Sequence, residues 1–121
     1  MMKYLLIIFL GGGAGSVLRF LISKSTQSLW NLGGFPLGTF TVNMLGCLLI
    51  GIFSSTIIKE HNELRLLLIA GFCGGFTTFS AFSLENLALW QNQNYLMLTL
   101  YTTASILLGM VAVWLGSHFQ L

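Results

Sequence analysis

The sequence predicts an all-α integral membrane protein, a single domain of four transmembrane helices. Of the 121 residues, 55% are hydrophobic and only 7% are charged, whereas about a quarter of the residues of a soluble domain are charged. About 20 apolar residues cross a hydrocarbon core about 30 Å thick, so a chain of this length holds at most four spans with short loops. We expect one domain over residues 1–121, with spans at about 4–23, 37–58, 66–90 and 95–116.

The composition also argues against several classes of function. A net charge of +2 is too small to indicate a nucleic-acid-binding surface. Cys47 and Cys73 both fall inside apolar spans, so we expect buried, inert thiols and neither a disulfide nor a Cys-based metal site. No group of residues suggests a nucleophile with its base and orienting partner. The sequence therefore indicates a protein that is not an enzyme.

The first predicted span is rich in small residues and contains one arginine. Its glycines, between Gly11 and Gly15, are typical of membrane helices that pack closely against a neighbour. Arg19 is different, because a charged side chain inside a span costs about 2.5–3.5 kcal/mol on insertion scales. Two interpretations remain open: the guanidinium extends to the membrane surface, or it faces an aqueous vestibule and attracts anions.

The second predicted span carries polar but uncharged side chains. A loop is predicted over 25–35 from its Ser, Thr, Gln, Asn and Gly content, and Pro36 suits the first turn of the helix that follows. Thr39 and Asn43 are four residues apart, so they share a face. Two roles for Asn43 remain open. Its amide either joins two helices, or its NH₂ group donates to an anion without forming an ion pair.

The centre of the third predicted span is poor material for a continuous helix. Gly74 and Gly75 each cost a helix about 1 kcal/mol relative to Ala, and the hydroxyl of Thr77 competes for backbone hydrogen bonds. We expect a break near Gly74–Thr77, where freed carbonyls suit a hard cation. One chain offers too few carbonyls to enclose an ion, whereas two antiparallel copies related by a twofold axis in the membrane plane would double them.

Aromatic residues recur after the glycine pair. Phe76, Phe79 and Phe82 are three apart and are predicted to form one stripe. Such a stripe usually packs against a neighbouring helix, but a ring edge is the positive end of the aromatic quadrupole and can also meet a small dehydrated anion. Uncharged donors would replace the rest of the anion's water and still release it. The candidate donors are Ser80, Thr39, Asn43, Tyr101 and Ser105.

The fourth predicted span has a polar side, and the third has one acid. Tyr101, Ser105 and Gly109 follow one another at intervals of four along one helical face. Glu85 is the only acid within a predicted span. Structural, gating and proton-carrying roles all remain open for it.

Charge at the ends of the spans gives a weak orientation signal. Four spans place both termini on one side of the membrane, with Lys3, Lys59 and Arg65 on that side and Lys24 on the other. So few charges permit insertion in either orientation, or in both.

These motifs together resemble the Fluc (CrcB-type) fluoride channel family over essentially the whole chain. The resemblance lies in four pieces that occur in the family's order and spacing. They are Gly11-Gly12-x-x-Gly15-x-x-x-Arg19-Phe20, Pro36-x-Gly38-Thr39-x-x-x-Asn43-x-x-Gly46, Gly71-Phe72-x-Gly74-Gly75-x-Thr77-Thr78-Phe79-Ser80-x-Phe82-Ser83-x-Glu85 and Tyr101-x-x-x-Ser105-x-x-x-Gly109.

The resemblance implies an antiparallel, dual-topology homodimer with two fluoride pathways, in the cytoplasmic (inner) membrane of a cell. Passive export of fluoride would relieve its toxicity. A structural sodium ion would lie at the dimer centre, on the backbone carbonyls of Gly74 and Thr77 from both copies. The residues that match the family's pore and charged positions are Asn43, Phe79, Phe82, Tyr101, Ser105, Arg19 and Glu85.

Two positions depart from the family pattern. Gly109 stands where some members continue the polar track of the fourth span with a hydroxyl, and this departure affects the outer end of that track. Phe76 stands where several members carry leucine, a difference that concerns packing.

Two other functions remain open on the sequence. A small multidrug-type proton-coupled exporter also has four spans, and it requires a carboxylate within the membrane, for which Glu85 is the sole candidate. A non-transporting assembly subunit would use its glycines only to pack helices.

Overall fold

The computed structural model describes residues 1–29, 33–56 and 60–119. The predicted end of the second span at 57–58, and Lys59, lie outside the described residues. The helices are α1 (Met2–Leu29), α2 (Leu37–Ser55), α3 (Asn62–Arg65), the π-helical η2 (Leu66–Cys73), α4 (Gly74–Phe76), α5 (Phe79–Gln91) and α6 (Tyr95–Ser117).

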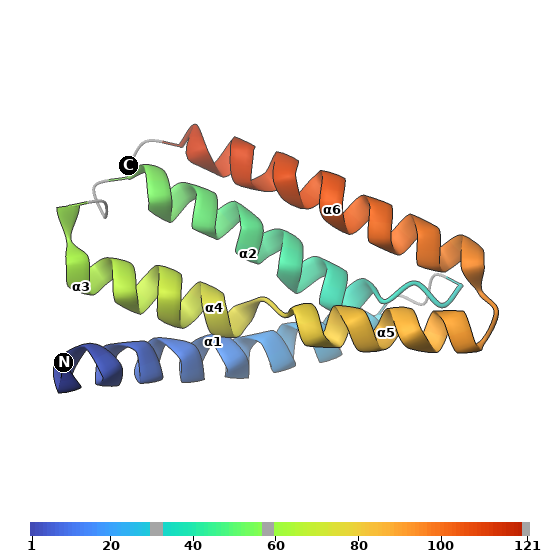
Figure 1. The fold of residues 1–121 in the computed structure, drawn as a ribbon, viewed down its shortest axis with the longest axis horizontal. Coiled ribbons are helices and arrows are strands. Elements are labelled where there is room, and N and C mark those ends of the chain that lie inside the picture. The colour runs from blue at the N-terminus through green and yellow to red at the C-terminus, as the bar shows by residue number, and fades with distance from the viewer. Residues whose placement is uncertain (30–32, 57–59, 120–121) are drawn as a thin grey trace.

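Four helical stretches are long and apolar enough to cross a membrane, so the protein is a multi-pass membrane protein. They are Met2–Ser28, Leu37–Ser55, Asn62–Gln91 and Tyr95–Ser117. The third of these comprises α3, η2, α4 and α5 in succession. The N-terminus and the last turn of α6 lie at the same end of the molecule (Figure 1).

The first helix is longer than the sequence predicted. The loop expected from residue 25 is wrong over 25–29, because α1 continues to Leu29. Gln27 is a good helix former and Ser25 an intermediate one, so neither breaks a helix. The first positive φ angles come later, at Gly33 and Gly34 (58° and 90°). The Gln27 side chain also accepts a hydrogen bond of 3.0 Å from the Gly38 amide, which ties the end of α1 to the start of α2.

Glycines bring α1 into backbone contact with η2 and α4. A methyl group at Gly15 would overlap the carbonyl oxygen of Phe72, and one at Gly75 would overlap that of Gly12. Gly71 likewise faces the backbone of α1 at Gly11. Small residues at such a contact allow two helices to approach closely and gain dispersion energy. This is the packing role expected for the glycines of the first span.

A second glycine contact joins α2 and α6. A methyl at Gly51 would overlap the carbonyl oxygen of Val113, and one at Gly116 would overlap that of Leu48. Residue numbers rise together along both contacts, so α1 runs parallel to η2 and α4, and α2 runs parallel to α6. Figure 1 shows these pairs as two layers, α2 with α6 above α1 with the third span.

The third span is interrupted, but not at its glycine pair. Gly74 is helical (φ −62°, ψ −36°), whereas Thr77 (φ −90°, ψ 158°) and Thr78 (φ −148°, ψ 125°) are extended. The predicted break near Gly74–Thr77 is therefore confirmed at its C-terminal end, at Thr77 and Thr78, while the glycine pair before it stays helical. Gly75 is used for close approach to α1, and helical geometry is retained there because packing outweighs the low helix propensity of glycine.

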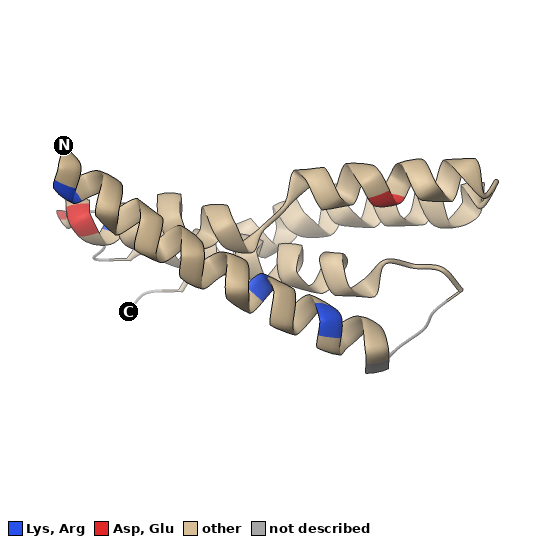
Figure 2. Ribbon diagram, turned by 90° about the horizontal axis from the view of Figure 1, so that it is seen from below, with Lys and Arg blue, Asp and Glu red and all other residues tan. Residues whose placement is uncertain are grey.

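Most charged residues lie together where α1 begins, beside α3, and a few lie farther along the spans (Figure 2). Lys3 Nζ and Glu63 Oε1 form an exposed ion pair of 2.6 Å between these two helices. Because both side chains are largely exposed to solvent, such a pair contributes little to stability. The charges away from this end are Arg19 and Lys24 on α1 and Glu85 on α5.

Candidate functional site

The interruption of the third span is bridged by the side chain of Asn43. The Asn43 Nδ2 group donates to the Thr78 carbonyl at 3.1 Å, and the Thr78 amide donates to Asn43 Oδ1 at 2.8 Å. An extended segment inside a membrane must satisfy its backbone groups within the protein. Asn43 does this for both backbone groups of Thr78, so its amide joins α2 to the third span.

These bonds leave backbone carbonyls without their usual helical partners. In a continuous helix the Thr78 amide would bond to the Gly74 carbonyl, but it donates to Asn43 instead. The Ala81 amide would bond to the Thr77 carbonyl, but it donates to Thr78 Oγ1 at 3.1 Å and so caps α5. The carbonyls of Gly74 and Thr77 are thereby freed of the bonds that a continuous helix would give them.

Arg19 lies close to the same interruption. Its Nε atom donates to the Gly75 carbonyl at 3.0 Å, and Ser16 Oγ lies 3.5 Å from the same oxygen. The guanidinium thus satisfies a carbonyl near the end of α4. It also lines a cavity of about 580 Å³ together with Lys24, Thr39 and Glu85.

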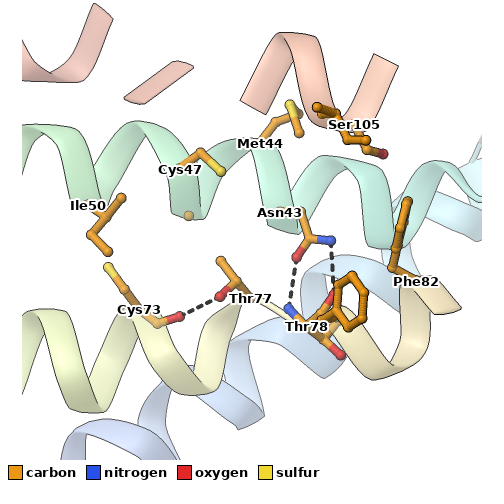
Figure 3. Close-up of a pocket in the computed structure, with 12 residues that line it drawn as sticks. Asn43, Met44, Cys47, Ile50, Cys73, Thr77, Thr78, Phe82 and Ser105 are labelled. Atoms are coloured by element: carbon orange, nitrogen blue, oxygen red, sulfur yellow. Dashed lines mark hydrogen bonds between the residues drawn. The ribbon is translucent and has the colours of Figure 1, made fainter. Parts of the chain in front are cut away.

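A second cavity, of about 340 Å³, lies between α2, α6 and the interrupted span (Figure 3). Thr78 lines both cavities. Figure 3 shows the Asn43 amide extending toward Thr78, and Ser105 reaching the cavity from α6. The residues lining this cavity are Asn43, Met44, Gly46, Cys47, Ile50, Cys73, Thr77, Thr78, Phe79, Phe82, Ser105 and Ile106.

Polar groups in this cavity are uncharged, and one of them has no partner. Ser105 Oγ is buried and makes no hydrogen bond within the part of the chain that the structure describes. A buried hydroxyl without a partner costs about 1–3 kcal/mol. Such a group is available to a ligand that enters the cavity.

The three phenylalanines expected in one stripe are separated by the interruption. Phe76 is buried and stacks on Phe72, with ring centroids 5.5 Å apart. Phe79 and Phe82 follow the break, line the cavity and lie 5.8 Å from each other. The predicted single stripe is wrong because the spacing assumed an unbroken helix, and the extended residues at 77 and 78 re-orient everything after them.

Two of the predicted donors are bonded to Glu85 instead of facing the 340 Å³ cavity. Thr39 Oγ1 donates to Glu85 Oε2 at 2.6 Å, and the Tyr101 hydroxyl donates to Glu85 Oε1 at 2.8 Å. Tyr101 is fully buried, and its ring lies 5.0 Å from that of Phe82. Glu85 therefore joins α2, α5 and α6, which the sequence did not predict because these residues are far apart along the chain.

The structure brings some predicted site residues together and separates others. Asn43, Phe79, Phe82 and Ser105 share the smaller cavity. Arg19, Thr39 and Glu85 share the larger one, with Tyr101 bonded to Glu85. Ser80 is exposed and bonds to Thr78 across 3.1 Å.

Thr78 is the residue of the site that the sequence reasoning missed. It is the N-cap of α5 and contributes to both cavities. A threonine directly before a helical apolar run is a recognised start signal, and that signal would have located the second half of the span.

The site has no side-chain cluster for a metal ion in the part of the chain that the structure describes. Over the described ranges, no three His, Cys, Asp or Glu side chains gather in a metal-binding arrangement. The groups suited to a cation are instead the freed carbonyl oxygens of Gly74 and Thr77, the oxygen-only chemistry that hard ions prefer. One chain presents too few of them to surround an ion.

Comparison with known proteins places this architecture in a family. Residues 6–117 match the family model described as CrcB-like protein, Camphor Resistance (CrcB). The chain is 50% identical over 119 residues to a protein of Phocaeicola vulgatus named fluoride-specific ion channel FluC, covering 95% of this chain and 96% of the relative. Proteins of the same name from Flavobacterium psychrophilum and Rhizobium leguminosarum are each 46% identical, covering 95% and 92% of this chain and 94% and 90% of the relatives. The chain belongs to the CrcB family, as its sequence motifs had indicated.

Proposed function

We propose that this protein is a channel that conducts fluoride passively through the membrane. The carrying observation is the 340 Å³ cavity beside the interruption, where the Asn43 amide, the unpartnered Ser105 hydroxyl and the rings of Phe79 and Phe82 meet. The relatives named fluoride-specific ion channel FluC, about half identical over nearly the whole chain, support the same assignment.

The chemistry of this cavity suits a small anion that must also leave. Fluoride has to exchange its water for donors, and conduction requires binding that is weak enough to reverse. Neutral hydroxyl and amide donors meet that requirement, whereas a fixed cation would hold the ion too tightly. The positive edges of Phe79 and Phe82 supplement the donors without adding a full charge.

We also propose that two antiparallel copies form a dimer with a sodium ion between them. Its support is local: Gly74 is exposed, and the carbonyls of Gly74 and Thr77 have lost their usual helical partners to Asn43 and Thr78. When bound, sodium would neutralise these carbonyl dipoles at the ends of two half-helices. Those residues would hold the ion through backbone oxygens alone.

Two measurements test this assembly. Protein purified in sodium and then dialysed into N-methylglucamine should retain one sodium per two chains in elemental analysis; a sodium-free dimer contradicts the ion site.

A C-terminal epitope should be accessible to antibody in both right-side-out and inside-out vesicles. Access from one side only contradicts the antiparallel arrangement.

In a cell, such a channel would lie in the cytoplasmic membrane and let fluoride leave down its gradient, relieving toxicity. In acid surroundings fluoride is protonated to neutral HF, which enters the cell, dissociates inside and leaves the fluoride anion trapped. Passive conduction then suffices for export. This role calls for no catalytic group.

The pathway is tested with variants of its rings. Phe79→Ile and Phe82→Ile should each abolish fluoride efflux from liposomes while leaving a monodisperse folded protein, because the aliphatic side chain has no positive edge. Phe72→Leu is the matched control, since Phe72 stacks on Phe76 away from the cavity. Wild-type flux in both variants would show that the rings of Phe79 and Phe82 are not part of the fluoride pathway.

A further inference from the structure

Tyr101, Ser105 and Gly109 follow one another at intervals of four on α6, and the last of them carries no side chain. Ser105 Oγ is buried without a partner beside the 340 Å³ cavity, and position 109, four residues on, is a glycine. Along this face the helix therefore presents a donor and then bare backbone. An anion moving past Ser105 in that direction meets no side chain from α6 at the next turn.

Another helix supplies the side chain at that point. A side chain on Gly109 would begin 3.5 Å from Sγ of Cys47 and 3.5 Å from Cε of Met44. Both belong to α2 and line the same cavity. Figure 3 shows Asn43, Met44 and Cys47 in succession along α2 within the cavity.

Close packing of α2 against α6 fixes this register. Asn43, Cys47 and Gly51 are spaced by four on α2, so they share a face. At the last of them a methyl would overlap the Val113 carbonyl of α6, which leaves the two backbones no room to slide. Cys47 is therefore held opposite Gly109.

We propose that the Cys47 thiol is the donor that follows Ser105 in the anion route, in place of the side chain that Gly109 lacks. The inference rests on the proposed channel function. It replaces the expectation of an inert thiol, because a neutral S–H group is a weak donor and Cys47 is only partly buried. It also makes the pathway a site for a thiophilic cation such as methylmercury, which would bond to sulfur and release the thiol proton to water.

The first test compares two substitutions that differ by one hydroxyl. Cys47→Ala should lower fluoride efflux from liposomes about fivefold, the effect of one lost hydrogen bond. Cys47→Ser places a hydroxyl donor where the thiol was and should retain wild-type fluoride flux or exceed it. Equal flux in Cys47→Ala and the wild type, or an equal loss in both variants, overturns the proposal. A wild type that does not conduct would instead refute the channel function itself.

The second test moves the donor from α2 to α6. The double variant Cys47→Ala with Gly109→Ser should regain most of the lost flux, because the added Cβ makes only ordinary contacts at 3.5 Å. A folded double variant that conducts no better than Cys47→Ala contradicts the assignment.

The third test uses methylmercury to reach the thiol in the open pathway. Cys73 lines the same cavity, so the test is made in Cys73→Ser, where methylmercury should block fluoride efflux through the remaining Cys47. It should not block the double variant Cys47→Ser with Cys73→Ser; block that persists there, or is absent in Cys73→Ser, places the Cys47 thiol outside the route.

Discussion

The two halves of the third span are held by different means. The first half, η2 and α4, lies with its backbone directly against α1 at Gly71 and Gly75. The second half, α5, is fully described, and of its residues only Leu89 is buried. It is held by side chains, chiefly the bonds from Thr39 and Tyr101 to Glu85. One span thus combines a closely packed half that presents carbonyls with a loosely packed half that presents rings.

The difference follows from what each half must offer. Backbone contact positions the freed carbonyls near the end of α4, since no flexible side chain intervenes. Phe79, at the start of α5, is 78% exposed in the single chain. This exposed ring suits a surface that a second copy, lipid or a passing ion contacts.

The largest effect should come from closing the glycine contact of the first half. Gly15→Ala places a methyl against the Phe72 backbone and should abolish recovery of folded protein. Gly13→Ala, two residues away on the same helix, meets nothing within 4 Å and should stabilise α1 by up to about 1 kcal/mol. Size-exclusion profiles in detergent and thermal unfolding compare the two. Equal recovery would mean that the first half does not depend on backbone contact.

A smaller effect should come from removing the bridge between the halves. Asn43→Ala leaves the amide and carbonyl of Thr78 unpaired, at a cost of about 2 kcal/mol, and it removes a pathway donor. Fluoride efflux should fall at least about tenfold, with a lowered unfolding temperature. Ser54→Ala is the control, because among the described residues Ser54 bonds only to a carbonyl of its own helix. Unchanged flux and stability in Asn43→Ala would show that the interruption is held without this side chain.

The smallest effect should come from the carboxylate that holds the second half. In Glu85→Gln the amide oxygen can still accept from Tyr101, so passive fluoride flux should change less than about twofold. A proton-coupled exporter would lose pH-driven transport with this substitution, since the other acid in a described span, Glu63, is exposed at the start of the third span and paired with Lys3. Efflux measured with and without a pH gradient distinguishes a channel from an exporter. If the wild type shows pH-driven transport and Glu85→Gln shows no flux, the exporter is favoured.

Local composition was enough to predict the four helices and the presence of an interruption, because both depend on neighbours in the chain. The break lies at the end of the predicted Gly74–Thr77 stretch, but the glycines do not cause it: Gly75 allows close approach to α1 and stays helical. The single Phe stripe failed because helical spacing does not continue across Thr77 and Thr78.

The candidate site was less accessible from sequence than the helices. Its polar residues could be identified from the sequence because they are uncharged polar groups within apolar spans. Their pairing could not, because Asn43 meets Thr78 and Thr39 meets Glu85 across 35 and 46 residues of chain. Such contacts depend on the register between helices, which glycine packing sets.

The most direct measurement of the central claim is fluoride efflux from liposomes that contain the purified wild-type protein, followed with a fluoride electrode. With equal pH on both sides and valinomycin to carry potassium, efflux should start at once and exceed that from protein-free liposomes. Without valinomycin it should stop, because passive movement of an anion builds up a potential. Efflux that requires a pH gradient, or no efflux above the protein-free level, would contradict a fluoride channel.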